Sequence, residues 1–410
     1  MKIIYLSQLF ELDNEFGSDR NYFNCKKLKE SGHHVTVITS NISYETSLPK
    51  FKTKWFKPIK IMHNGIDIYY VYSPKNFIGN YFKRVLYYIS YFIFSFLLKK
   101  PTENADIVYA ISSPLSVALL GLLLSKRLKA KFYLEITDLW PDVFVTMEYL
   151  KNKFVLSLLR KIELSCYQRA KYIIALSRGI QKNIQSKTQQ KEKVVLIPNG
   201  VDKELFSLKN NILTEAKHLK KKLNLEGKFV CLYLGAHSLY NALNTIIEAA
   251  NLIKENSEII FVLIGDGDKK AELKKLAKNY HLNNILFFSP IPRIETPVWL
   301  QIADIFLLPN LKGEFYKMNL QNKFFDYLAS AKPIIFAGSG ESAEIILEAN
   351  GGKVVKAEDA KAMVNAILEL KSYPLNERVK IGKNGRSYVL THYERNMLSL
   401  KLINLIKNGL

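Results

Sequence analysis

The chain has 410 residues, too many for one ordinary core, and its 48% apolar and 23% charged residues predict two or three globular domains and exclude a largely disordered chain. Lysine and arginine outnumber aspartate and glutamate by 59 to 37, and the resulting charge of +22 fits nucleic acid, an anionic membrane or a phosphorylated substrate as partner. The three cysteines lie far apart, which excludes a disulfide framework or a cysteine-pair zinc site and indicates a reducing compartment.

The first half of the chain alternates strand-like and helix-like segments. It begins with a strand at 2–7, a loop that contains Gly17, and a helix from about Ser18 that includes Arg20. Because the strands are mostly apolar on both faces, they predict a parallel sheet covered by helices, with ligands bound beyond the carboxyl ends of its strands. The further strands are expected at 33–40, 66–73, 106–112, 131–137, 172–177 and 194–200.

Residues 85–98 form the longest apolar run, and pairs of basic residues flank it at both ends. The run is too short to span a membrane, so it predicts either a plain buried helix or a helix that lies in the headgroup layer. In the second case the protein would sit peripherally on the inner face of the cytoplasmic membrane. The side chains expected to contact lipid or acceptor there are Lys83, Arg84, Tyr88 and Phe92.

The second half repeats the pattern, and a turn sequence near Asn199 joins the two halves. Its strands are expected at 229–235, 259–265, 285–289, 305–309, 332–338 and 352–356. We therefore predict an α/β fold of two doubly wound, Rossmann-like parallel-sheet domains, 1–205 and 206–385, that face a deep cleft. The helical tail 386–410 is long enough to cross back and pack on the first domain.

The octapeptide EITDLWPD (135–142) follows a strand and crowds Glu135, Asp138 and Asp142 into one strand end. Like charges placed there repel and must lose water, so they indicate a charged ligand or a proton-transfer task. The alternative is a strand end capped by aspartate, with Trp140 and its neighbouring proline packing as a lid.

Four motifs in order resemble the retaining glycosyltransferases of the large group 1 family (family 4), and the resemblance covers nearly the whole chain. The subgroup that it is most similar to includes bacterial fucosamine transferases of O-antigen and capsule synthesis. The resemblance implies the GT-B fold, a donor-binding second domain and an acceptor-binding first domain. The motifs are EITDLWPD (135–142), IPNGVDKELF (197–206), YLGAHSLYNALNTIIEAA (233–250) and NKFFDYLASAKPII (322–335).

In the second half, the resemblance implies a diphosphate-binding turn that supplies backbone N–H groups without a metal. The family often has basic side chains in this turn, and none occurs here between Gly235 and Leu243, so Lys323 is the expected substitute. Asp326 matches the acid that binds the ribose hydroxyls, unless the two form only a surface ion pair at i,i+3 spacing. The expected donor-binding residues are Gly17, Gly235, Ala236, His237, Ser238, Ile291, Arg293, Asn322, Lys323 and Asp326.

In the first half, Gly17 would let the backbone approach the donor, and Asp138 is expected to contact the reacting sugar or the acceptor hydroxyl. Glu135 is expected to act with Asp138 and Lys323 in catalysis, or to point back into the domain and orient a loop. Arg20 and Trp140 complete the predicted acceptor or membrane surface. The two aspartates of IGDGD (264–268) are interpreted as a turn, and neither a metal nor a cofactor is expected.

The predicted reaction is the metal-independent transfer of a hexose from a UDP-sugar to a lipid-linked, polyprenyl diphosphate saccharide. The loop at Ile291 does not distinguish uracil from guanine. Two alternatives stay open: a GT-B-fold UDP-sugar epimerase, and a non-catalytic GT-B scaffold subunit. A dehydrogenase is disfavoured because no GxGxxG follows a strand, and nucleic acid is disfavoured because the basic residues are dispersed.

Overall fold

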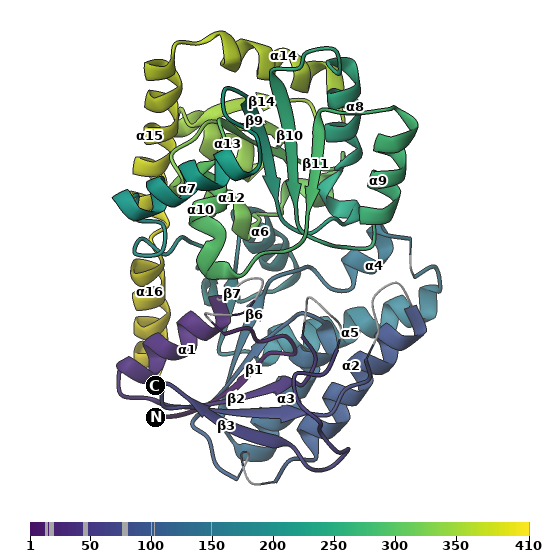
Figure 1. The fold of residues 1–410 in the computed structure, drawn as a ribbon. Coiled ribbons are helices and arrows are strands. Elements are labelled where there is room, and N and C mark those ends of the chain that lie inside the picture. Colours follow the sequence, from purple (N-terminus) through teal and green to yellow (C-terminus); the bar gives the residue numbers. More distant parts are fainter. Residues whose placement is uncertain are drawn as a thin grey trace. The chain divides into compact units, whose positions relative to one another are not determined.

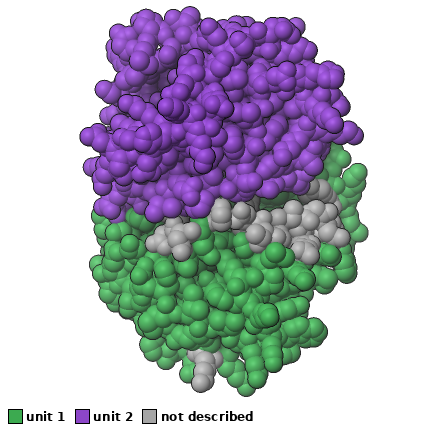
Figure 2. All heavy atoms as spheres, in the orientation of Figure 1, with its two compact units in different colours: residues 1–198, 399–410 green, residues 199–398 purple. Residues whose placement is uncertain are grey.

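The computed structural model describes residues 1–12, 15, 20–43, 48–75, 81–99, 101, 103–148 and 150–409. The chain forms two compact units, residues 1–198 with 399–410 and residues 199–398, which Figure 2 draws in green and purple. The chain enters the second unit at Asn199, before the boundary expected after residue 205. Of the tail expected to pack on the first unit, only the part from Ser399 belongs to it.

In its described part, unit 1 holds a sheet with the strand order β3-β4-β2-β1-β5-β6-β7-β8 (Figure 1). Neighbouring strands are parallel except β3 and β4, which pair antiparallel at one edge. The order changes direction at β1, which lies between β2 and β5, and ligands of such sheets bind at this switch point. The strands are β1 (Lys2–Leu6), β2 (His34–Ser40), β3 (Ile59–His63), β4 (Ile66–Val71), β5 (Ile107–Ile111), β6 (Lys131–Ile136), β7 (Tyr172–Ala175) and β8 (Val194–Leu196).

The helices of unit 1 cover the sheet, and α3 is apolar nearly all round because it packs on the sheet between α2 and α5. Gly121 permits this close approach, since a Cβ there would lie 2.6 Å from the Ala110 Cβ on β5. Ser177 caps α6 by accepting a hydrogen bond from the Ile180 amide at 3.0 Å. The helices are α1 (Arg20–Glu30), α2 (Tyr81–Phe96), α3 (Leu115–Leu128), α4 (Asp142–Thr146), α5 (Lys153–Arg169) and α6 (Arg178–Lys187).

Unit 2 holds an all-parallel sheet with the order β11-β10-β9-β12-β13-β14, and its switch point lies between β9 and β12. Buried apolar clusters on both faces of this sheet form its core. The strands are β9 (Phe229–Leu234), β10 (Ile259–Ile264), β11 (Ile285–Phe288), β12 (Ile305–Pro309), β13 (Ile334–Ala337) and β14 (Gly352–Val355). The helices are α7 (Asn210–Lys222), α8 (Asn244–Leu252), α9 (Lys270–Asn279), α10 (Thr296–Gln301), α11 (Glu314–Lys317), α12 (Asn322–Ala329), α13 (Glu341–Glu348), α14 (Ala360–Ser372) and α15 (Leu375–His392).

The last helix, α16 (Arg395–Asn408), begins in unit 2 and contributes to unit 1 from Ser399 onwards. There the Ser399 hydroxyl donates to the Asn24 side-chain oxygen at 3.3 Å, and Lys131 donates to the Gly409 carbonyl at 2.9 Å. The predicted α/β architecture of two Rossmann-like parallel-sheet domains is thus confirmed. Over the described ranges, the search for a helix of membrane-spanning length and hydropathy finds none.

Candidate active site

The loop after β9 is built to bring a lysine close to its backbone. Gly235 has φ +155°, and a Cβ at this position would lie 2.7 Å from the Lys323 Nζ atom. Lys323 comes from the first turn of α12, so its ammonium group reaches the carboxyl end of β9, beside the switch point of unit 2. The structure thus places Lys323 beside this loop, and its role as the substitute for a basic loop side chain stays a prediction.

Lys323 is held by neutral groups. Its Nζ atom donates to the Tyr233 hydroxyl and, at 2.9 Å, to the Asn241 side-chain oxygen, and it lies 4.3 Å from the Tyr233 ring centroid. In the described part of the chain no carboxylate lies within ion-pair distance of it. Burial therefore lowers the pKa of Lys323 from 10.5 to about 7. The surface ion pair with Asp326 that the spacing allowed is not formed.

Tyr233 and Asn241 also order the loop itself. The Tyr233 hydroxyl donates to the Ala236 carbonyl at 2.8 Å, and the Asn241 amide donates to the same carbonyl at 2.7 Å and to the Ser238 hydroxyl at 2.9 Å. Sequence reasoning singled out neither residue. Tyr233 was part of an apolar strand pattern, and Asn241 lacks the charge by which a phosphate-binding residue is usually recognised.

His237 lies in the loop after β9 with its side chain fully buried. Its ring centroid is 6.0 Å from that of Tyr233 and 6.4 Å from that of Phe287, and neither ring nitrogen has a hydrogen-bond partner among the described residues. Burial and nearby Lys270 lower the pKa of His237 to about 4, so the ring is neutral at pH 7. The imidazole of His237 is therefore part of the core, and its expected contact with the donor stays a prediction.

Arg293 and Asp326 form a buried, two-pronged ion pair. The Arg293 Nη1 and Nη2 atoms donate to the two Asp326 oxygens at 2.6 and 2.9 Å, and the guanidinium also lies 5.1 Å from the Phe206 ring centroid. Arg293 and Asp326, both predicted to bind the donor, are thus directed at each other, and the contact of Asp326 with the ribose hydroxyls stays a prediction. Ile291 packs on the core and Asn322 begins α12.

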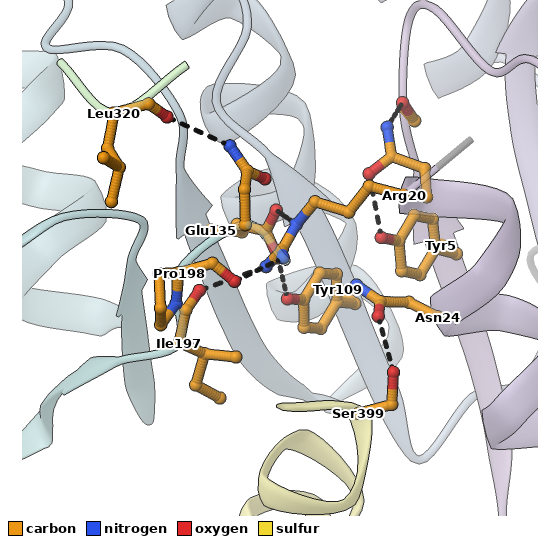
Figure 3. Close-up of polar contacts among 12 residues, drawn as sticks. Tyr5, Arg20, Asn24, Tyr109, Glu135, Ile197, Pro198, Leu320 and Ser399 are labelled. Carbon is orange, nitrogen blue, oxygen red and sulfur yellow. Dashed lines mark hydrogen bonds and ion pairs between the residues drawn. The ribbon is translucent and has the colours of Figure 1, made fainter. Parts of the chain in front are cut away.

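The carboxylates of EITDLWPD have different partners in unit 1, and Figure 3 shows those of Glu135. Glu135 is fully buried and accepts from Arg20 Nε at 3.1 Å and from the Tyr109 hydroxyl at 2.5 Å. Arg20 also donates to the carbonyls of Ile197 and Pro198, at 3.2 and 2.8 Å. The expectation that Arg20 lies on an acceptor or membrane surface is therefore wrong, and Glu135 orients an internal network rather than a reacting group.

Asp142 is also balanced, since it accepts from Lys187 at 2.9 Å. Asp138 differs: among the described residues no lysine or arginine pairs with it, and burial raises the pKa of its carboxyl, an effect that the nearby Thr137 and Ser113 hydroxyls partly offset. Asp138 follows β6, two strands from β1, so it is the carboxylate of the octapeptide that is not committed to an ion pair. Gly17, predicted to approach the donor, lies outside the described residues.

Trp140 packs between Phe144, at 4.6 Å between ring centroids, and Tyr88 of α2, at 6.5 Å. Its indole N–H is buried and has no hydrogen-bond partner in the part of the chain that the structure describes. Two of the residues predicted for the acceptor side, Trp140 and Tyr88, are thus brought together. On α2, Lys83 is exposed, Arg84 and Phe92 are half-buried, and Tyr87 and Tyr91 bury their rings toward the sheet.

Two models of known protein families match this chain, and together they identify its family. Residues 24–205 match the model described as Glycosyltransferase Family 4, and residues 215–388 match the model described as Glycosyl transferases group 1. The chain is a group 1 glycosyltransferase. The two models meet near the junction between the two units, and Lys323, Tyr233 and Asn241 all fall within the second match.

Individual relatives of this glycosyltransferase are distant. An uncharacterized glycosyltransferase of Methanocaldococcus jannaschii, MJ1069, is 24% identical, with 88% of this chain and 90% of the relative covered. The putative colanic acid biosynthesis glycosyl transferase WcaI of Escherichia coli is 26% identical over 70% of this chain and 71% of its own. The crystal structure of Anabaena Alr3699/HepE in complex with UDP and glucose superposes with a TM-score of 0.74 at 15% identity, covering 99% of both chains, which supports the fold.

Proposed function

We propose that this glycosyltransferase moves a sugar, an N-acetylated or deoxy hexose, from a UDP-sugar to a saccharide carried on a polyprenyl diphosphate. The product would be part of a surface polysaccharide such as O-antigen or capsule, made at the inner face of the cytoplasmic membrane. Support comes from WcaI, whose name places it in colanic acid biosynthesis, and from HepE, which was crystallised with UDP and glucose. The motifs shared with the fucosamine-transferase subgroup support the sugar class.

The observation that carries the proposal is the position of Lys323. A cation that is half-buried and held only by neutral oxygens is poised for an anionic ligand, because a diphosphate would supply the charge that the protein does not. The binding of a diphosphate would raise the pKa of Lys323 from about 7 and fix the charged form. The ammonium group would then stabilise the negative charge that develops on the leaving UDP.

We further propose that the reaction retains the anomeric configuration and needs no metal. In same-face attack, the bond from the acceptor oxygen to the anomeric carbon forms while the bond to the diphosphate oxygen breaks. The acceptor proton passes to the leaving diphosphate, so no strong protein base is required. Asp138 would contact the reacting sugar or the acceptor hydroxyl, and catalysis would consist of positioning and charge stabilisation.

One assay separates this proposal from its two alternatives. The purified chain is incubated with a panel of UDP-sugars and a short-chain polyprenyl diphosphate saccharide, and products are read by mass spectrometry and by NMR of the new anomeric centre. Addition of one hexose with the donor's configuration supports retaining transfer. Conversion of the UDP-sugar to its epimer without acceptor would identify an epimerase, and no turnover of any donor would indicate a scaffold.

Binding gives an independent reading of the donor half. UDP should raise the thermal unfolding temperature more than GDP, CMP or NAD, and Lys323→Ala should abolish the rise. A rise with NAD alone would overturn the proposal.

A further inference from the structure

A tight turn of sequence Lys-Trp-Phe-Lys, residues 54–57, projects two aromatic side chains from unit 1. Lys54 and Lys57 pair across the turn, with the Lys57 amide donating to the Lys54 carbonyl at 3.1 Å. Trp55 is 64% exposed and Phe56 is 69% exposed. Adjacent aromatic side chains that remain this exposed lose the free energy of burial, so their exposure indicates a surface that is covered in use.

The turn is continuous with the end of α2. Phe94 of α2 lies with its ring centroid 5.3 Å from that of Phe56 and 6.5 Å from that of Trp55. These three side chains, with Leu97 and Leu98, line a small hollow of about 50 Å³. The turn and the helix therefore form one apolar surface.

Helix α2 is apolar on both of its long faces. The inner face is anchored by polar contacts of its tyrosines: Tyr91 donates to the Ile38 carbonyl at 2.8 Å, and Tyr87 lies 3.1 Å from the Ser40 hydroxyl. The outer face carries large apolar side chains at the 3- and 4-residue spacing of one helical stripe. The exposed members of this stripe, which runs on past the helix end, are Phe82, Leu86, Ile89, Ile93 and Leu97.

The chain segment that carries this surface is basic. Residues 46–102 contain ten lysines and arginines and a single acidic residue, Asp67, although Glu45 and Glu103 border the segment and Lys50 is paired with Glu11 and Glu15. Asp67 is already engaged by Lys60 at 2.9 Å. A second copy of the chain would bring the same excess of positive charge against itself, whereas an anionic bilayer supplies both an apolar interior and negative headgroups.

We infer that the turn 54–57 and the outer stripe of α2 form one docking surface for an anionic lipid bilayer, with Trp55 and Phe56 inserted below the headgroups and Lys54 and Lys57 at their level. Its purpose rests on the proposed function, since it would place the chain where a lipid-linked acceptor is found. The lipid contact itself is a separate property and is measured without any donor or acceptor.

The test is co-sedimentation of the full chain with vesicles of phosphatidylcholine alone or with about a third phosphatidylglycerol. We expect binding to the anionic vesicles, weakened by added salt, and a loss of about tenfold or more in the double variant Trp55→Ser/Phe56→Ser. Leu86→Ser/Ile93→Ser should weaken binding in the same direction. Leu375→Ser, which removes an equally exposed apolar side chain from unit 2, is the matched control and should bind as the parent does.

Unchanged vesicle binding in Trp55→Ser/Phe56→Ser would overturn the inference. A stable dimer, seen by light scattering, that this variant disperses without any vesicle binding by the parent would also overturn it and assign the surface to a second copy. Thermal unfolding with and without UDP is recorded for every variant. A chain that binds vesicles but not UDP would refute the proposed function while leaving the lipid surface in place, and a chain that binds UDP but not vesicles would do the reverse.

Discussion

Two cations of this glycosyltransferase, Arg20 in unit 1 and Lys323 in unit 2, have different partners. In unit 1, Arg20 faces the Glu135 carboxylate, which also accepts from Tyr109. In unit 2, Lys323 faces only the Tyr233 hydroxyl and ring and the Asn241 amide oxygen. A cation whose charge is balanced inside the protein stabilises the fold, whereas a cation surrounded by neutral groups remains available to an anionic ligand. Arg20 therefore belongs to a structural network and Lys323 to the proposed donor site, although both lie near the carboxyl ends of buried strands.

The largest expected effect is on stability in unit 1. Glu135→Ala leaves the Arg20 guanidinium buried beside two carbonyls without its counter-charge, and removal of one partner of a buried pair costs about 3–5 kcal/mol. Urea unfolding followed by circular dichroism measures this loss. The exposed pair Lys269–Glu272 provides the control, because Glu272→Ala should cost less than about 1 kcal/mol. Equal losses in the two variants would contradict a structural role for Glu135.

The next effect is on catalysis in unit 2. Lys323→Ala should lower kcat/KM by about a hundredfold or more, since it removes the positive charge beside the leaving diphosphate.

The same variant should not destabilise the unliganded protein at pH 7, because a partly buried cation without a counter-charge is removed. The folded group binds fewer protons than the unfolded one between its pKa of about 7 and the ordinary 10.5, so parent stability rises with pH across that window. We expect the free energy of unfolding of the parent to rise between pH 7 and pH 9 and that of Lys323→Ala to lack this rise. Urea unfolding at the two pH values measures both.

A smaller effect on stability is expected from His237, a buried neutral side chain that becomes charged at acid pH. Its pKa falls to about 4 in the folded protein, so the unfolded chain binds more protons between pH 6.5 and 4 and stability is lost as the pH falls through this window. His237→Leu should remove roughly 1–3 kcal/mol of this acid sensitivity and leave UDP affinity unchanged. Unfolding at pH 7 and 5, with UDP titration at pH 7, measures both. A marked loss of UDP affinity would return His237 to the donor site.

The fold could be predicted from sequence because its strands are continuous apolar runs. The expected strands at 131–137 and 259–265 differ from β6 and β10 by one residue each. The position of Lys323 near the β9 loop was also predictable, because a helix that begins at a strand end points its first turn at that edge. The partners of these side chains were not predictable. Arg20 and Glu135 are 115 positions apart, and Arg293 and Asp326 meet only because α12 packs beside the loop after β11. No local pattern reveals whether a charged residue at a strand end is already paired.

A single substitution, Asn241→Asp, would give Lys323 a carboxylate partner like the one that Arg20 has. Asn241→Asp keeps the shape of the side chain but places a carboxylate 2.9 Å from the Lys323 Nζ atom, as Glu135 does for Arg20. The new charge should raise the pKa of Lys323 and compete with the diphosphate, so UDP affinity should fall about tenfold at pH 7. In the parent, UDP binding should take up protons above pH 7, and in the variant this uptake should move to higher pH, as measured by calorimetry in buffers of different ionisation enthalpy. Asn279→Asp, on the exposed end of α9, controls for the added negative charge and should leave affinity and proton uptake unchanged. UDP binding more than about twofold tighter in Asn241→Asp would mean that Lys323 does not bind the diphosphate, because full protonation of Lys323 from a pKa of about 7 gains at most that factor at pH 7 and the added carboxylate repels the anion.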